Sequence, residues 1–531
     1  MLIDGRTLRS DERFEVDLCI IGAGPAGISI AHELADRPIR VAVIESGGIH
    51  REPKVDRLGA GESVGYPYHA LERARARGIG GSSLHWEMLE SGGDEGWIAR
   101  PLDPIDLEPR PWLDSPGWPF RFDVLEPYYR RAQVVARLGP YAYDAAQWER
   151  EGSEQLALRG AVETVVMQRG PLTFSHHVGT LTSAPNISLI HHTTVTRLVT
   201  NFNATRVQKV IARPHPSSNV TVAARAFVLA TGGIENARML LLANETKPGG
   251  LGNDHDLVGR YFMEKLSARG GVFVPSDPSL VGRASFYASH IVDGIRLQGV
   301  VRLPEDTIRR EQLNNAILWL LAVPKAFASE AVRSAVTLAK SLRRRPLLGQ
   351  TRGHLRNTIA GCGDVASTAW QYLRFADKAP EVFIVAFQSE ATPLANSRVT
   401  LSESRDALGM PRARLDWRIA DRDRKSIRRL IDIFDAGVKE AGLGSVIRKF
   451  CDEQPPAMIV GNFHHLGTTR MHPDPRQGVV DEHGRVHGMD NLYVAGSSIF
   501  PTSGYANPTL TVVALSIKLA DHLAGVLRQL A

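Results

Sequence analysis

VDLCIIGAGPAGISIAHELA, residues 16–35, is the stretch that decides the fold of this chain. A mostly apolar run at residues 16–21 leads into the pattern G-x-G-x-x-G, supplied by Gly22, Gly24 and Gly27. Apolar residues at helical spacing then follow. This order predicts a strand, a turn and a helix, in which the first glycine makes the tight turn, the second lets a pyrophosphate approach the backbone, and the third packs helix on strand. Helix N-termini attract phosphates, so the stretch predicts a dinucleotide-binding βαβ unit.

The next strand favours an unphosphorylated ribose on that dinucleotide. A second apolar strand is expected over residues 39–44, and Glu45 follows it, 23 residues after Gly22. An acidic side chain at this place accepts a ribose hydroxyl, which favours FAD or NAD over NADP.

A third segment favours FAD over NAD. Residues 226–238, AFVLATGGIENAR, predict a strand, a turn at Thr231 and Gly232, and a helix. This turn is typical of the one that closes the FAD domain of flavoproteins. Paired strands expected over residues 186–199 would bring Val195 towards the adenine. No second G-x-G-x-x-G follows, so an NAD(P)H-binding partner domain is not expected.

The C-terminal region adds a helix whose start suits a flavin. A strand is expected over 491–495 and a loop over 496–506, after which Asn507 is a natural N-cap and Pro508 a natural first helical residue. A helix N-terminus aimed at the flavin would stabilise the negative charge that appears when the flavin accepts a hydride. A well-capped helix without that role has the same sequence.

These segments, together with GIGGSSLHWEM (78–88) and HHLGTTRM (464–471), resemble the glucose–methanol–choline (GMC) oxidoreductases over nearly the whole chain. The resemblance implies an FAD-dependent enzyme that oxidises an alcohol to a carbonyl. It uses the histidine of an H-x-x-G-T motif and a His or Asn before the last helix. Here the motif starts at His464, and the partner is Asn507. His465 fits the spacing less well, and the alternation of an extended chain predicts that it faces away. Imidazole suits the proton step because its pKa lies near the operating pH.

The motifs are closest to the pyranose-oxidase and sugar-dehydrogenase branch. That implies a sugar, polyol or glycosylated small molecule as substrate and oxygen, a quinone or another carrier as electron acceptor. In pyranose oxidases the histidine matching His85 can carry the flavin covalently, and both a covalent bond and a plain contact stay open here. The expected cofactor-binding residues are Gly22, Gly24, Gly27, Glu45, Ser82, Ser83, His85, Val195, Thr231, Gly232, Gly496, Ser497, Asn507, Pro508 and Thr509.

The expected fold class is α/β. A Rossmann-type FAD-binding domain of the GMC and para-hydroxybenzoate-hydroxylase-like kind is joined to a substrate domain with an antiparallel sheet. FAD-binding segments are expected at 1–120, 182–262 and 458–531, the last also catalytic. Residues 121–181 are a cap or linker, and residues 263–457 form the substrate domain with a helical insertion near 316–349. Gln388 and Glu390 are candidate substrate-facing residues of that domain, although simple strand-face polarity explains them equally well.

Composition is that of a soluble enzyme. Of 531 residues, 43% are hydrophobic and 23% charged. The net charge of +6 comes without a basic, aromatic-interleaved segment, so nucleic acid is not an expected partner. Three scattered cysteines without C-x-x-C argue against a disulfide framework and a zinc ribbon. The N-terminus lacks signal-peptide features and no 18-residue apolar run occurs, so a cytoplasmic location is expected.

Several alternatives stay open at this point. His464, His465 and His472 would need a further ligand for a metal site, so none is expected. GESVG at 61–65 matches a hydrolase elbow, but polar residues precede it where a buried strand is required. The segment 316–349 suits an amphipathic lid, a membrane-surface patch or an ordinary helical pair. A hydroxynitrile-lyase type of activity, or oxidation of a non-sugar apolar alcohol, would use the same fold.

Overall fold

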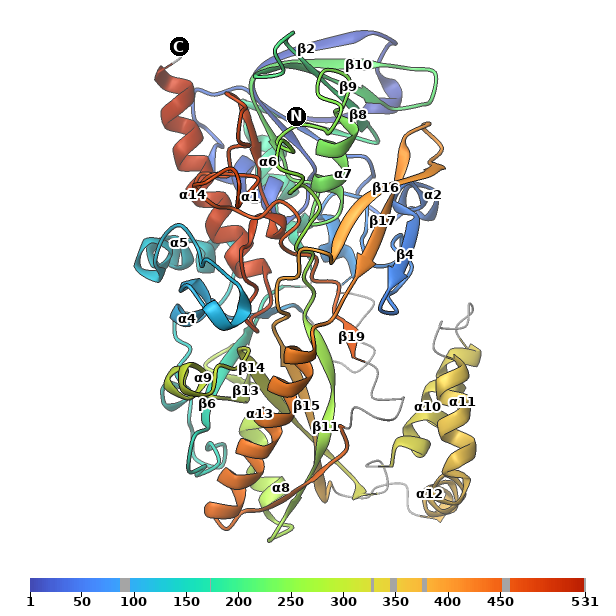
Figure 1. The fold of residues 1–531 in the computed structure, drawn as a ribbon, viewed down its shortest axis with the longest axis vertical. Coiled ribbons are helices and arrows are strands. Elements are labelled where there is room, and N and C mark those ends of the chain that lie inside the picture. The colour runs from blue at the N-terminus through green and yellow to red at the C-terminus, as the bar shows by residue number, and fades with distance from the viewer. Residues whose placement is uncertain are drawn as a thin grey trace.

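Two large sheets lie at opposite ends of an elongated molecule, as Figure 1 shows for the upper strands β2 and β10 and the lower strands β11 and β15. The structure is a computed structural model, and it describes residues 1–85, 96–171, 173–325, 329–343, 351–374, 380–450 and 459–529. The last helix, α14 (Thr509–Gln529), runs beside the upper sheet.

The upper sheet has eight strands and is the predicted dinucleotide-binding sheet. Its central strands are parallel because helical or long connections link them, and the buried end of β2 is apolar throughout, from Leu18 to Ile21. Helix α1 follows β2 and packs against α14. In spatial order the strands are β1 (Leu2–Asp4), β7 (Ile187–His191), β3 (Val41–Ile44), β2 (Glu12–Ile21), β10 (Val220–Leu229), β9 (Val207–Arg213) and β8 (Thr194–Thr200), with β20 (Leu492–Val494) paired to β10.

The lower sheet is antiparallel, as expected for a substrate domain. Helix α13 packs on one of its faces. In spatial order its strands are β18 (Gly444–Arg448), β11 (Leu266–Pro275), β15 (Val382–Ser389), β14 (Ala316–Val323), β13 (Ile295–Arg302), β6 (Glu163–Arg169) and β5 (Ile98–Ala99), with β12 (His290–Val292) and β19 (Val460–Gly461) on its borders. Strands β5 and β6 thus join this sheet from segments assigned by sequence to the cofactor domain and the linker.

Shorter elements complete the chain. A small sheet contains β16 (Arg398–Arg405), β17 (Pro411–Trp417) and β4 (Gly61–Gly65). GESVG is therefore a strand and not a hydrolase elbow. The remaining helices are α1 (Pro25–Glu33), α2 (Pro53–Asp56), α4 (Pro104–Leu107), α5 (Phe122–Val135), α6 (Val178–Ser183), α7 (Glu235–Leu242), α8 (Leu280–Arg283), α9 (Glu305–Glu311), α10 (Glu330–Arg343), α11 (Thr351–Ala360), α12 (Cys362–Arg374) and α13 (Asp421–Glu440).

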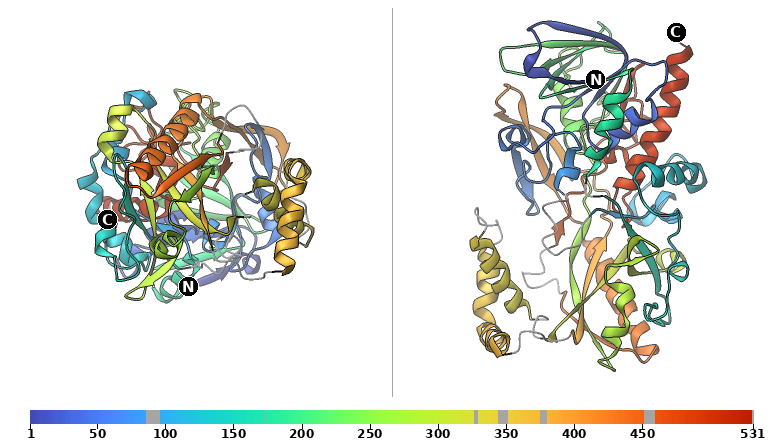
Figure 2. Two further views of the ribbon diagram at one scale, coloured as in Figure 1. Left: turned by 90° about the horizontal axis from the view of Figure 1, so that it is seen from below. Right: turned by 180° about the vertical axis from the view of Figure 1, so that it is seen from behind.

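The segment 316–349 is not helical from its start, which corrects the sequence prediction. Residues 316–323 form β14 between β13 and β15, with Leu318 opposite Phe387. An apolar run of eight residues suits a central strand as well as a helix, and here it pairs with a strand on each side. The helical part is α10 to α12, a separate group at the side of the lower sheet in Figures 1 and 2. Residues 344–350, between α10 and α11, lie outside the described residues.

Helix α14 is long and apolar enough to cross a membrane, but 72% of its most apolar window is buried inside the protein. That burial is typical of a core helix, and α14 packs between α1 and α5.

A buried ion pair fastens the lower sheet to two loops. Arg110 and Glu390 have no exposed side-chain surface, and two parallel hydrogen bonds of 2.5 and 2.9 Å join them. Glu390 also accepts the backbone N–H of Asn315 and of Gly504. The pair therefore links the end of β15 to the loop after α4 and to the loop before α14.

Replacing Arg110 by Met should strongly destabilise the protein. The change leaves the Glu390 carboxylate buried without its charge partner, which costs about 3–5 kcal/mol in the free energy of unfolding. Chemical denaturation followed by circular dichroism measures it. Arg121→Met is the control, because Arg121 lies 3.9 Å from Asp123 with both side chains mostly exposed. Equal stability of the two variants would contradict a role for the buried pair.

Candidate active site

A cavity of about 2110 Å³ lies between the two sheets and brings the predicted site residues together. Of the predicted cofactor-binding and catalytic residues, only Gly27 does not line it. A Cβ on Gly27 would lie 2.0 Å from the Gly22 carbonyl oxygen, which is the close helix–strand packing expected of the third glycine. The lining residues that sequence predicted are Gly22, Gly24, Glu45, Ser82, Ser83, His85, Val195, Thr231, Gly232, His464, Gly496, Ser497, Asn507, Pro508 and Thr509.

Three glycines shape a cradle along the upper wall of the cavity. Gly22 has a φ of +106°, and a Cβ there would lie 2.6 Å from the Ala230 carbonyl oxygen. Gly232 also has a positive φ, of +88°, but a Cβ there would meet nothing within 4 Å. Beside them Gly24 is the N-cap of α1. No side chain caps the first N–H groups of this helix. Bare backbone next to open space is the form in which proteins receive a pyrophosphate, so the cradle fits a dinucleotide.

Glu45 directly follows β3 and is hydrogen-bonded to the cradle. Its Oε2 accepts the Ala23 N–H at 2.8 Å, and its Oε1 accepts the Gly47 N–H at 3.0 Å. Burial raises the pKa of this carboxyl group. The fixed carboxylate oxygens line the cavity near Val195, which fits the predicted ribose contact.

His85 has a ring nitrogen available at the cavity. Its Nδ1 lies 3.3 Å from Arg51, while Nε2 is buried and has no hydrogen-bond partner among the residues that the structure describes. Burial and then the charge of Arg51 lower the pKa of His85, so the ring is neutral. A neutral, unpartnered nitrogen fits contact with a flavin. Trp86, its neighbour in the motif, lies outside the described residues.

His464 also lines the cavity. Its backbone N–H donates to Glu264 Oε1 at 2.8 Å, and its buried Nδ1 has no hydrogen-bond partner within the described part of the chain. Burial, followed by the positive charge of Lys265, lowers the pKa of His464 to about 3. The imidazole is therefore neutral at physiological pH and can accept a proton, but in the enzyme without substrate its pKa lies well below the operating pH near which the sequence prediction placed it.

Asn507 is held by its carbonyl oxygen. Gln388 Nε2 donates to Asn507 Oδ1 at 2.8 Å and to the Tyr505 carbonyl at 2.7 Å. Asn462 Nδ2 in turn donates to Gln388 Oε1 at 3.2 Å. Since Asn507 Oδ1 already accepts a hydrogen bond, the NH2 group of Asn507 (Nδ2) is left as the donor towards the cavity.

The structure separates the two polar residues proposed for β15. Gln388 lines the cavity, but it holds the loop before α14 through the bonds just described. Glu390 does not line the cavity, because its carboxylate is paired with Arg110 behind the sheet wall. The prediction that Glu390 faces the substrate is therefore wrong.

His465 does not simply face away from the site, as strand alternation predicted. It also lines the cavity, and its Nε2 lies 2.8 Å from the Tyr68 hydroxyl, which donates to Glu264 Oε2 at 2.5 Å. Alternation fails because β19 ends at Gly461 and Phe463 adopts a left-handed φ of +61°. The chain is therefore not extended at the two histidines.

Sequence reasoning missed Glu264, Lys265 and Tyr68, which surround the two histidines. Burial raises the pKa of Glu264 to about 7 and lowers that of Lys265. His472 stands apart: its Nδ1 accepts the Asp474 N–H, and it does not line the cavity. Among the described residues, no metal-ligating group includes the three histidines considered from sequence.

One cavity lined by a dinucleotide cradle, a neutral histidine and an anchored asparagine is the site of a flavin-dependent oxidoreductase. Residues 393–516 match the family model described as GMC oxidoreductase. The chain is 23% identical to the fructose dehydrogenase large subunit of Gluconobacter japonicus, over 98% of this chain and 100% of that protein. It is 37% identical to a C-glycoside 3-oxidase of Microbacterium trichothecenolyticum over 24% of this chain and 25% of that protein.

A formate oxidase structure from Aspergillus oryzae, solved in work on FAD modification, covers 99% of this chain and 100% of its own. Its TM-score is 0.55 at 17% identity. The chain resembles the GMC oxidoreductases through the match of residues 393–516, and it is an FAD-dependent enzyme that acts on CH–OH groups.

Adding a methyl group at Gly232 should lower FAD content. Gly232→Ala places a Cβ in the open cradle, where the cofactor is expected. Gly294→Ala is the matched control, since Gly294 has a φ of +80° and equally open surroundings but does not line the cavity. Both changes should cost about 1–2 kcal/mol in backbone strain. Only the first should reduce the flavin-to-protein absorbance ratio, and equal ratios would argue against a cradle at Gly232.

Proposed function

We propose that this enzyme oxidises a hydroxyl group of a sugar, polyol or glycosylated metabolite to a carbonyl. In this proposal His464 is the base, and Asn507 positions the substrate oxygen. The observation that supports it most is the arrangement of the pair. A neutral imidazole with an unpartnered buried nitrogen shares one cavity with an amide whose oxygen is already anchored.

The two residues divide the work on the alcohol. Oxidation removes a proton from the hydroxyl oxygen and a hydride, with its electron pair, from carbon. His464 accepts the proton, a role worth roughly 10²- to 10⁴-fold in rate. The Asn507 amide donates to the substrate oxygen and so holds the hydroxyl against the imidazole. Bound FAD supplies the acceptor for the hydride.

The substrate class follows from the cavity and from the relatives. Beyond the cofactor cradle the cavity extends to α10–α12 and the residue before them. Polar side chains line it there beside the apolar Ala331 and Ala360: Ser329, His354, Asn357 and Asp364. Hydrogen-bonding groups of this kind suit a molecule with several hydroxyls better than an apolar alcohol. The names of the fructose dehydrogenase and the C-glycoside 3-oxidase point to the same chemistry.

An anaerobic panel of sugars, polyols, glycosides and apolar alcohols tests the proposal. Bleaching of the flavin absorbance by sugars or glycosides would support it, and bleaching by apolar alcohols alone would refute the substrate class. A lyase would convert its substrate with no bleaching at all. Re-oxidation by oxygen or by a quinone then identifies the electron acceptor.

His464→Ala should slow flavin reduction by about two orders of magnitude or more while FAD stays bound. His465→Ala is the matched control, one residue away on the same cavity wall but hydrogen-bonded to Tyr68. We expect it to keep most of the reduction rate. Stopped-flow reduction under anaerobic conditions measures both. A larger loss in His465→Ala than in His464→Ala would contradict the proposal that His464 is the base.

Lys265→Met should move the acid limb of the kcat/KM profile to higher pH. On the acid side Lys265 is protonated, and its charge disfavours the His464 imidazolium. Removing that charge raises the pKa of His464, so the base is lost by protonation at a higher pH than in the wild type. Lys439→Met, on an exposed helix position, is the control. An acid limb that stays in place or moves to lower pH contradicts the coupling.

A further inference from the structure

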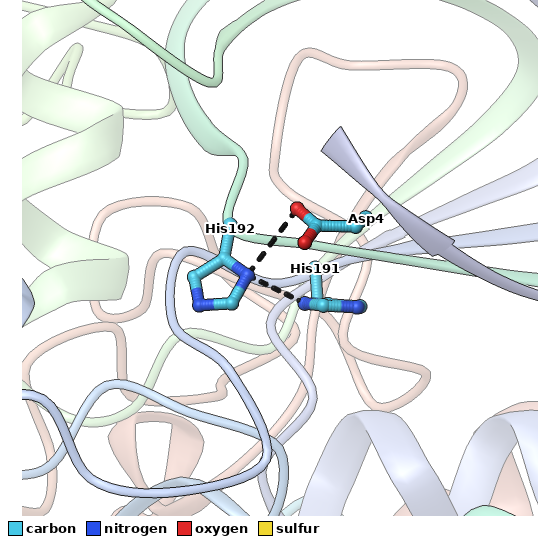
Figure 3. A group of neighbouring side chains, drawn as sticks. All are labelled: Asp4, His191 and His192. Carbon is cyan, nitrogen blue, oxygen red and sulfur yellow. Dashed lines mark hydrogen bonds and ion pairs between the residues drawn. The ribbon is translucent and has the colours of Figure 1, made fainter. Parts of the chain in front are cut away.

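Outside the cavity, two histidines and an aspartate meet at one edge of the upper sheet (Figure 3). Asp4 ends β1 and His191 ends β7, and the two are direct partners in the parallel pairing of these strands. His192 follows with a left-handed φ of +52°, and its ring centroid lies 4.6 Å from that of His191. The sheet register thus fixes two of the side chains, and the turn at His192 adds the third.

The three groups point ligand atoms at one another. His191 Nδ1 and His192 Nδ1 are hydrogen-bonded at 2.7 Å, and His192 Nδ1 lies 3.4 Å from Asp4 Oδ1. A metal ion would replace the hydrogen bond between the rings and take the place of its proton. Tetrahedral Zn²⁺ with bonds of roughly 2.0–2.1 Å separates its ligand atoms by about 3.3 Å. The Asp4 carboxylate already has this spacing from His192 Nδ1. The two ring nitrogens need to part by only about half an ångström to reach it.

A fourth residue sets the tautomer of His192. Its Nε2 lies 2.6 Å from Glu52 Oε1, so the proton sits on Nε2 and the lone pair of Nδ1 faces Asp4 and His191. A carboxylate behind a ligating histidine is the usual outer contact of protein zinc sites. His191 is mostly buried, which holds its ring in place.

One neighbour opposes a cation. Arg6 Nη2 donates to Asp4 Oδ2 at 2.6 Å and Arg6 Nε to Oδ1 at 3.0 Å. This guanidinium competes for the aspartate oxygens and adds a positive charge beside the three ligands. A metal ion at this place has to share the Asp4 oxygens with the Arg6 guanidinium or displace it.

We propose that Asp4, His191 and His192 bind one divalent transition-metal ion, best Zn²⁺, with water completing the coordination. Two imidazoles and one carboxylate are a set that zinc accepts with an open fourth position. The ion would tie the N-terminal edge strand to β7 just before Thr193, which lines the cavity. This inference is independent of the proposed reaction, since none of the three residues lines the cavity.

The test uses untagged, FAD-loaded enzyme freed of metal by a chelator. Zinc titration by calorimetry should give one ion per chain, and zinc should raise the melting temperature. The double variant His191→Ala/His192→Ala should lose both effects. His176→Ala, in another adjacent histidine pair, should keep them. Absence of zinc binding to the wild type, or binding unchanged in the double variant, overturns the proposal.

Substitutions of two neighbours, Glu52 and Arg6, should change the zinc affinity in opposite directions. They test the proposal even if the double variant fails to fold. Glu52→Gln removes the outer carboxylate and should weaken zinc binding by about 10- to 100-fold. Arg6→Ala removes the competing charge and should tighten it. Both side chains are partly exposed, so the fold should tolerate the changes. Equal affinities in the two variants would count against a site at Asp4.

Discussion

The burial of the Lys265 ammonium group constrains the rest of the site. Lys265 has no exposed surface and donates to the backbone carbonyls of Ser503 and Gly504. A buried charge is costly unless it is paired and hydrogen-bonded, and here Glu390 and Asp106 supply negative charge nearby. The loop before α14 therefore cannot shift without exposing or isolating these charges. Because that loop ends at Asn507, the proposed substrate-positioning amide rests on a charge network that never meets the substrate.

The neighbouring residue, Glu264, holds His464 in place as Lys265 holds the loop of Asn507. Its carboxylate accepts the backbone N–H of His464, while Lys265, next in sequence, holds the loop of Asn507. Two adjacent side chains, an acid and a base directly before β11, thus fix the histidine and the asparagine relative to each other. A strand start is a rigid base for this purpose, since β11 pairs with both β15 and β19. Fixing reacting groups before the substrate arrives is where much of enzymatic rate enhancement originates.

The sequence predicted what is local and missed what is distant. The strand, glycine turn and helix around Gly22 lie within one short segment, and each glycine has a steric reason that spacing alone expresses. The H-x-x-G-T spacing likewise selected His464. Glu264 and Lys265 belong to no motif, and their partners lie 200 and 238 residues along the chain. Glu390 had the right polarity for a substrate contact. Its carboxylate is instead paired with Arg110, which is distant in the sequence. The apolar run at 316–323 suited helix or strand until the sheet supplied partners on both sides.

Their hydrogen bonds distinguish the adjacent histidines. The H-x-x-G-T spacing alone only made His464 the better candidate for the base. His465 Nε2, Tyr68 and Glu264 form a closed chain: the imidazole N–H donates to the phenol oxygen, and the phenol donates to the carboxylate. A proton accepted by His465 would add a charge to a ring whose pKa burial already holds well below its usual value. His464 is equally sheltered, but its Nδ1 has no partner among the described residues. The left-handed turn at Phe463 makes this division possible, because it directs two neighbouring rings to one cavity in different hydrogen-bonding states.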